Sequence, residues 1–200
     1  VVCPLGVEPS FLAVPRAKPE AITELIFFGR VAPSKGFLEA IEALGILAKR
    51  GVTNWTYRMY GSGRIEWARE AADKHGVADR VINYEPVDTA GLAQALGKAH
   101  LAVLPSHVES FGHSMVEAQA SGIPVVAYAY GSVPEVVQDG VTGWLGPQKD
   151  VQALADNIER AIQDTEGTYQ AGLRARERVR RSYSWTKTAE IILEGLARMG

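Results

Sequence analysis

Short, continuously apolar runs alternate with longer stretches of helical periodicity along most of this chain, and this alternation is what most constrains its fold. Such runs are typical of strands in a parallel sheet, because helices cover both faces of that sheet. The runs that we expect to be strands are Leu25–Phe28, Trp55–Tyr60, Val81–Tyr84, Leu101–Leu104, Val125–Tyr128 and, with a weaker pattern, Gly143–Leu145.

Helical patterns fill most of the intervals between these runs and the last quarter of the chain. The segments are Lys35–Lys49, Arg64–His75, Thr89–Lys98, Val151–Gln163, Tyr169–Arg181 and Thr186–Met199. The order predicts an α/β fold: a Rossmann-like open parallel sheet of about six strands, helices on both faces and a helical C-terminal extension. Ligands of such sheets bind at the carboxyl ends of the strands.

The bulk properties favour one globular domain over residues 1–200. A formal net charge of −2 argues against a nucleic-acid surface, which requires clustered basic charge. Cys3 is the single cysteine, so neither an intrachain disulfide nor a cysteine metal cluster is expected. Without a run of about 20 apolar residues or a signal peptide, a cytoplasmic protein is the default. The opening Val1-Val2-Cys3-Pro4 suggests an excised domain.

Two carboxylates lie eight residues apart in the loop-to-helix segment Pro105–Ala118, at Glu109 and Glu117. A fully helical interval would rise about 12 Å, farther than the roughly 5–9.5 Å between paired glycosidase carboxylates. The turn between them has backbone N–H groups suited to an anion, supported by the helix dipole. A ligand with hydroxyl groups at both ends and phosphates in the middle, such as a nucleotide-sugar, would fit this arrangement.

A second candidate segment follows the first expected strand, at Gly29, Arg30 and Lys35. Gly29 lets a ligand approach the backbone, Arg30 offers a fork of donors, and Lys35, opening a helix, offers a point charge. The two cations suit a diphosphate. The alternative is that Arg30 only covers a strand end and that Lys35 is solvated in the first helical turn.

Taken together, these motifs resemble the retaining GT-B-fold glycosyltransferases (glycosyl transferases group 1), and specifically their C-terminal, donor-binding half. The resemblance covers nearly the whole chain in the family's order, and the Glu-x7-Glu spacing is intact. The residues that carry it are Gly29-Arg30, Lys35-Gly36, Pro105-Ser106, Glu109-Ser110-Phe111-Gly112, Glu117-Ala118, Gly122–Ala127, Val133-Pro134-Glu135, Gly140–Gly143 and Ser184-Trp185.

The resemblance implies a role for each matching residue. Glu117 would hold the ribose hydroxyls, Arg30 and Lys35 would bind the diphosphate and stabilise the leaving group without a metal, and Glu109 would orient the transferred sugar. The base would meet the loop that contains Val87. The implied catalytic group is Glu109, Arg30 and Lys35, and the implied substrate-binding group is Gly29, Val87, Ser110, Phe111, Gly112, His113 and Glu117.

For the whole enzyme, the resemblance implies transfer of a sugar, of hexosyltransferase type and with retention, from a nucleoside-diphosphate sugar to a carbohydrate or lipid-linked acceptor. No cofactor and no metal are expected. The acceptor domain of the family precedes this half, so the helix within residues 183–200 would cross back to it. That leads us to expect exposed apolar side chains among Ile191, Ile192, Leu193 and Leu196. The isolated chain is expected to bind donor weakly and to be inactive.

Two other classes of function stay open: a nucleotide-sugar epimerase on the same architecture, and a non-catalytic nucleotide-sugar-binding module. The presence of all four residues Arg30, Lys35, Glu109 and Glu117 argues against a non-catalytic module. A dehydrogenase-type domain is weaker still, because the glycine fingerprint at Gly61-Ser62-Gly63 lacks its third glycine, and a tight turn is the preferred interpretation.

The remaining polar features are expected to be structural. His107 and His113 are interpreted as packing residues, although His113 departs from the family pattern and could reach the donor sugar. The five arginines of the last-but-one helix (Arg174, Arg176, Arg178, Arg180 and Arg181) are expected to form a solvated face. The alternative interpretation of these arginines is that they make peripheral contact with anionic lipid at the inner face of the membrane.

Overall fold

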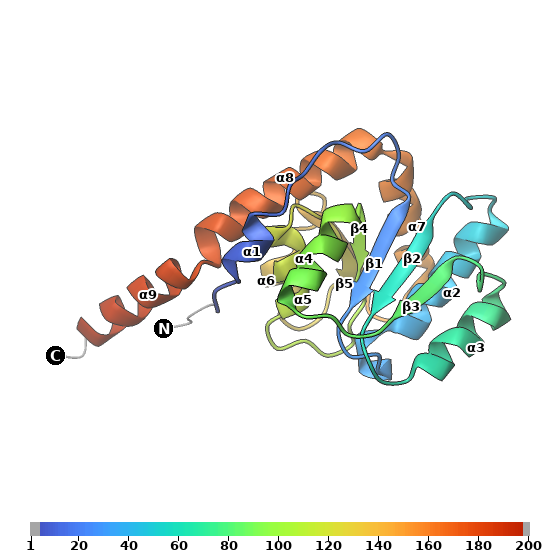
Figure 1. The fold of residues 1–200 in the computed structure, drawn as a ribbon, viewed down its shortest axis with the longest axis horizontal. Coiled ribbons are helices and arrows are strands. Elements are labelled where there is room, and N and C mark those ends of the chain that lie inside the picture. Colours follow the sequence, from blue (N-terminus) through green and yellow to red (C-terminus); the bar gives the residue numbers. More distant parts are fainter. Residues whose placement is uncertain (1–4, 198–200) are drawn as a thin grey trace.

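Six parallel strands form one sheet in the order β3-β2-β1-β4-β5-β6 in the computed structural model, which describes residues 5–197 (Figure 1). The strands are β1 (Glu24–Phe28), β2 (Thr56–Tyr60), β3 (Val81–Tyr84), β4 (Leu101–Val103), β5 (Val125–Tyr128) and β6 (Gly143–Gly146). Every neighbouring pair is parallel. All six expected runs form strands, with bounds that differ by one residue at some ends, so the predicted fold class is confirmed.

Helices cover both faces of this sheet. They are α1 (Pro9–Leu12), α2 (Phe37–Lys49), α3 (Ile65–His75), α4 (Thr89–Lys98), α5 (His113–Ala120), α6 (Val133–Val136), α7 (Val151–Gln163), α8 (Thr165–Ser182) and α9 (Trp185–Ala197). On one face α2 packs against α3 and α7, and on the other α5 packs against α8 and α1. The core between these layers is almost wholly aliphatic and aromatic. None of the described helices has the length and apolar character that crossing a membrane would require.

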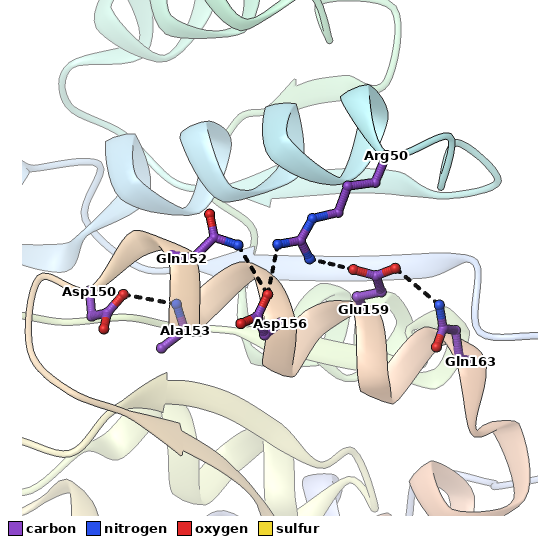
Figure 2. A network of polar contacts seen from close by, with 7 residues as sticks. All are labelled: Arg50, Asp150, Gln152, Ala153, Asp156, Glu159 and Gln163. Carbon is purple, nitrogen blue, oxygen red and sulfur yellow. Dashed lines mark hydrogen bonds and ion pairs between the residues drawn. The ribbon is translucent and has the colours of Figure 1, made fainter.

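A polar network joins α2 to α7 at the C-terminal end of α2 (Figure 2). Arg50 donates to Asp156 over 2.8 Å and also to Glu159, both on α7, while Gln152 and Gln163 donate to the same two carboxylates. These contacts are partly exposed and fix the end of α2 that lies away from the strand-end loops. The opposite end of α2 faces the functional site described below.

Two arginines of α8 are half-buried and hydrogen-bonded to the protein, which corrects the interpretation of the whole cluster as an exposed face. Arg176 donates to the carbonyls of Ala120 and Ser121 at the end of α5, over 3.1 and 2.8 Å, and to Val14 over 2.6 Å. Arg178 donates to two carbonyls at the end of α6. The last carbonyls of a helix lack intrahelical partners, so nearby cations satisfy them and complement the dipole.

The other three arginines remain exposed, as expected. Arg180 and Arg181 form ion pairs with Glu177 on the same helix, and Arg174 donates to the carbonyl of Val141. Fewer guanidinium groups of α8 are therefore available to contact a partner than the sequence suggests.

The last described helix, α9, extends away from the sheet (Figure 1). Ile192 and Leu193 are exposed, as expected, and Trp185 at its start is about half exposed. Ile191 is half-buried. The side chain of Leu196, the end of the predicted helix at Met199 and the first four residues with Cys3 lie outside the described residues. The exposed apolar side chains suit a helix that packs against further protein, and its crossing to an acceptor domain stays a prediction.

The capping contacts of Arg176 predict a stability effect. Replacing Arg176 with Met keeps the aliphatic stem but leaves the carbonyls at the end of α5 without their charged donor, so unfolding free energy should fall by about 2–3 kcal/mol. The matched control is Arg181→Met on the same helix, which should change it by no more than about 0.5 kcal/mol. Urea denaturation of the three proteins measures both values, and equal effects of the two substitutions would contradict the capping role.

Candidate functional site

The strand order reverses between β1 and β4, and a cleft opens at this reversal. From β1 the chain continues outward to β2 and β3, whereas from β4 it continues the other way to β5 and β6. The segments that leave two such neighbouring strands go to opposite faces of the sheet, which creates a crevice at the carboxyl ends of the strands. The cleft has a volume of about 580 Å³. Its walls are Phe28, Gly29, Arg30, Lys35, Tyr60, Gly61, Ser62, Pro86, Val87, Leu92, Glu109, His113, Ser114 and Glu117.

The cleft brings together residues that the sequence pattern proposed from separate segments. Those that line it are Gly29, Arg30, Lys35, Val87, Glu109, His113 and Glu117. The turn residues Ser110, Phe111 and Gly112 do not line it. Ser114 lines the cleft in the first turn of α5 but was not among the candidates, although its place just after a glycine at a helix start was a usable signal.

Lys35 and Glu109 form an ion pair inside the cleft, with 2.7 Å between Lys35 Nζ and Glu109 Oε2. The two side chains are 25% and 11% exposed, so the pair is well shielded from solvent. Lys35, which was expected to bind the phosphates, and Glu109, which was expected to orient the sugar, therefore contact each other directly. A ligand entering here would meet a neutralised pair whose hydrogen bonds it could share or replace.

The backbone around Lys35 differs from the expected helix start. A 3-10 turn, η1 (Pro33–Lys35), carries the lysine, and α2 begins only at Phe37. Between them Gly36 has φ 68°, and a Cβ there would lie 1.9 Å from the carbonyl oxygen of Pro105. Only glycine permits this approach, which brings the N-terminal end of α2 against the loop after β4.

The other wall of the cleft carries open, unpaired groups. Gly29 has φ 126°, and a Cβ built there would meet no atom within 4 Å, so the backbone faces free space. Arg30 is exposed and forms no ion pair within residues 5–197. A positive side chain beside an accessible backbone is suited to an anionic ligand.

The turn before α5 does not present all its N–H groups to the cleft. The N–H of Gly112 donates to Glu109 Oε1 over 3.2 Å, so the carboxylate of Glu109 occupies the position expected for an anion. The ring of Phe111 packs edge-on against His113 and Tyr183, with centroids 4.9 and 5.9 Å apart. The carboxylate of Glu109 therefore closes part of the turn. The first turn of α5 remains the anion-facing part.

Glu117 projects from the second turn of α5 into the cleft and forms no ion pair within the described residues. Burial raises the pKa of its carboxyl to about 7. The otherwise apolar helix around it, with Met115, Val116 and Ala118 buried, explains this desolvation. A carboxyl with a strongly shifted pKa in a cleft is characteristic of functional sites.

The glycine turn after β2 has a structural explanation, as preferred from the sequence. A Cβ at Gly61 would lie 1.9 Å from the carbonyl oxygen of Gly29, and one at Gly63 would lie 2.4 Å from that of Val31. The turn therefore packs against the loop after β1. Among the described residues, no three His, Cys, Asp or Glu side chains are grouped so that they could hold a metal ion.

Comparison with known proteins agrees with this geometry. The family model described as glycosyl transferases group 1 matches residues 13–178. The chain belongs to this family. Its sequence is 34% identical to a glycogen synthase of Mycobacterium tuberculosis over 186 residues, which cover 90% of this chain and 44% of that protein. The chain thus spans less than half the length of this curated relative.

Two solved structures have the same fold. Anabaena Alr3699/HepE, crystallised in complex with UDP, is 25% identical with a TM-score of 0.80, over 96% of this chain and 54% of that one. The C-terminal domain of the glycosyl transferase group 1 protein LpcC from Francisella tularensis is 27% identical with a TM-score of 0.71, over 82% of this chain and 86% of that one. The likeness supports the expected position of this glycosyltransferase domain as a C-terminal half.

The raised pKa of Glu117 predicts a pH-dependent stability. The carboxyl of Glu117 loses its proton near pH 4.5 in the unfolded chain and near pH 7 in the folded protein. The folded state therefore binds more protons between these pH values, and stability falls as pH rises through this range. Glu117→Gln removes this loss. The variant should be about 1–3 kcal/mol more stable than wild type at pH 8 and nearly equal to it at pH 4.5. Urea denaturation at the two pH values measures the difference, and a pH-independent difference would contradict the assignment.

Proposed function

We propose that this chain is the donor-binding domain of a glycosyltransferase and that its cleft holds a nucleoside-diphosphate sugar. The observation that carries the proposal is the convergence of two cations, Arg30 and Lys35, with two carboxylates, Glu109 and Glu117, at the reversal of strand order. Two proteins similar to this chain support the proposal: one is a glycogen synthase, and the other, HepE, was crystallised in complex with UDP.

The donor would lie along the cleft with its base toward Val87 and Leu92. Glu117 would accept hydrogen bonds from the ribose hydroxyls, and the diphosphate would lie between Arg30 and the first turn of α5. The sugar would reach Glu109, with His113 at the side. Each group meets the kind of ligand atom that its charge favours, which is the arrangement that orients an anomeric carbon for attack.

The chemistry that we propose is attack of an acceptor hydroxyl on the anomeric carbon of the donor. The bond from that carbon to the phosphate oxygen breaks, the glycosidic bond forms, and the hydroxyl proton passes to the departing nucleoside diphosphate. Negative charge develops on the leaving phosphate oxygens, where Arg30 and Lys35 stabilise it electrostatically. Metal independence, retention of configuration and a hexosyl donor belong to this proposal through the family resemblance. The protein would also need the remaining length of its relatives, so we propose that this chain alone is inactive.

The acceptor would be a carbohydrate or a lipid-linked sugar, and the enzyme would act in the cytoplasm, at the inner face of the membrane for a lipid-linked acceptor. Membrane contact through α8 has limited support, because Arg176 and Arg178 cap helices and the exposed Arg180 and Arg181 pair with Glu177. Packing of the exposed side chains Ile192 and Leu193 against an acceptor domain is the better-supported role for the C-terminal extension.

An epimerase or a non-catalytic module would use the same donor cleft. An epimerase would convert the sugar of its donor without any acceptor. The longer protein, in which this chain is joined to an acceptor domain, can be incubated with donor alone. Analysis of the sugar afterwards distinguishes an epimerase from a transferase. A module would show binding but no reaction when acceptor is added.

Donor binding is tested by calorimetry with UDP, GDP and ADP and with their glucose, mannose and N-acetylglucosamine forms. We expect saturable binding of one nucleotide class, weakened at least about tenfold in Glu117→Ala because the ribose loses its charged acceptor. Glu70→Ala, an exposed glutamate on α3, is the matched control and should bind like wild type. Failure of all these ligands to bind this chain and the longer protein would refute the proposal.

Donor affinity should also depend on pH. Ribose hydroxyls favour the ionised carboxylate of Glu117, whose pKa without ligand is about 7, so binding releases a proton. Affinity for a nucleotide-sugar should therefore rise by up to tenfold per pH unit below about pH 7 and should level off above it. Calorimetry in buffers of different ionisation enthalpy measures the proton release. Flat affinity between pH 5.5 and 8 would show that Glu117 does not bind the donor through its charge.

A further inference from the structure

His107, two residues before Glu109, is tied to four different segments of the protein. Its Nε2 is 2.7 Å from Glu39 Oε1 on α2, and its ring lies against that of Tyr128, at the end of β5, with centroids 5.7 Å apart. Its backbone N–H donates to the carbonyl of Ser34, and its own carbonyl accepts from the side chain of Gln148, each over 2.9 Å. This confirms a structural role for His107 and shows what it joins.

Glu109 is held separately and by other groups. Its backbone carbonyl accepts from the hydroxyl and N–H of Ser132, over 3.1 and 3.4 Å, and its carboxylate accepts from Lys35 and Gly112. Val108 between the two residues is 67% exposed, so its side chain adds little packing. The part of the loop beyond the buried Ser106 is therefore held at positions 107 and 109.

The segment that runs from η1 into the first turn of α2 supplies a partner to each of these positions. Lys35 and Glu39 are four residues apart, and they contact Glu109 and His107 respectively, each over 2.7 Å. The two contacts form a double clamp between one short segment and the loop. Loss of the Glu39–His107 contact would remove one half of this clamp, so that the only remaining side-chain link of the two would be the one between Lys35 and Glu109.

The Glu39–His107 pair is costly to bury, which argues against a role in stability alone. The two side chains are 26% and 15% exposed, and Glu39 Oε2 and His107 Nδ1 are buried without a hydrogen-bond partner in the described part of the chain. Such groups lose the hydration that they have in the unfolded chain. An apolar pair of similar volume would stabilise the fold at least as well, but it would not fix one geometry.

We propose that Glu39 and His107 are positioning residues that hold the loop after β4, and with it Glu109, in the orientation that binds the donor sugar. The proposal rests on the proposed function of the cleft. It assigns them no contact with substrate: they act through Glu109. Their effect should thus fall on the sugar part of donor affinity and spare the nucleotide part.

The test compares Glu39→Ala, His107→Ala, the double variant and Glu39→Gln in this 200-residue chain. Arg50→Ala is the matched control, because it removes ion pairs of the same helix α2 at its other end. Hydrogen exchange measured by mass spectrometry reports on residues 106–112. Calorimetry gives the ratio of the Kd for UDP to that for UDP-glucose, or for the GDP or ADP pair if the ligand panel selects another base.

We expect hydrogen exchange in residues 106–112 to become at least about tenfold faster in both alanine variants, because local opening of the loop no longer requires the Glu39–His107 contact to break. The affinity ratio should fall about fivefold or more in each, with no further fall in the double variant, since both remove one contact. Glu39→Gln keeps a hydrogen-bonding partner for His107 and should restore most of both values. Arg50→Ala should leave both unchanged.

Two results would overturn the positioning role. One is unchanged exchange in residues 106–112 despite loss of the pair, and the other is an affinity ratio equal to wild type although the loop has loosened. Failure of the wild-type chain to bind any nucleotide is a separate result. It would count against the proposed function, and exchange would then decide alone whether the pair holds the loop.

Discussion

The reversal of strand order between β1 and β4 is the constraint on which the rest of the structure depends. Because the segments that follow these strands go to opposite faces, the sheet leaves a crevice at their carboxyl ends that no helix fills. Gly29 and Arg30 follow one strand, and the loop with Glu109 follows the other. Groups that lie about 80 residues apart in the chain therefore form one cleft without any unusual backbone beyond a few glycines.

Within that cleft, close packing of the N-terminal end of α2 sets the electrostatics. Gly36 allows the backbone to touch Pro105, and this contact brings Lys35 to Glu109 and Glu39 to His107. Lys35 and Glu109 thus neutralise each other inside the cleft. Within the described residues Arg30 and Glu117 form no ion pair, and both line the cleft.

Stability and function draw on the same helix α5 in opposite ways. Its apolar surroundings bury Met115, Val116 and Ala118 and stabilise the fold, but they also desolvate Glu117 and raise its pKa. The C-terminal end of α5 is in turn capped by Arg176 from α8. The C-terminal helices are thus more than an extension, because they support the helix that carries the carboxyl group of the site.

The sequence by itself determined the strands, most of the helices, the family and the segments that meet at the cleft, because these follow from local periodicity and short motifs. Strand runs such as Val125–Tyr128 were recognisable since each needs only its own residues to be apolar. Only the tertiary structure decided that Lys35 pairs with Glu109, that His107 meets Glu39, and that Arg176 caps α5. Each of these contacts joins residues more than 50 positions apart, and a side chain's partner at such a distance depends on how the helices pack, which no local pattern records.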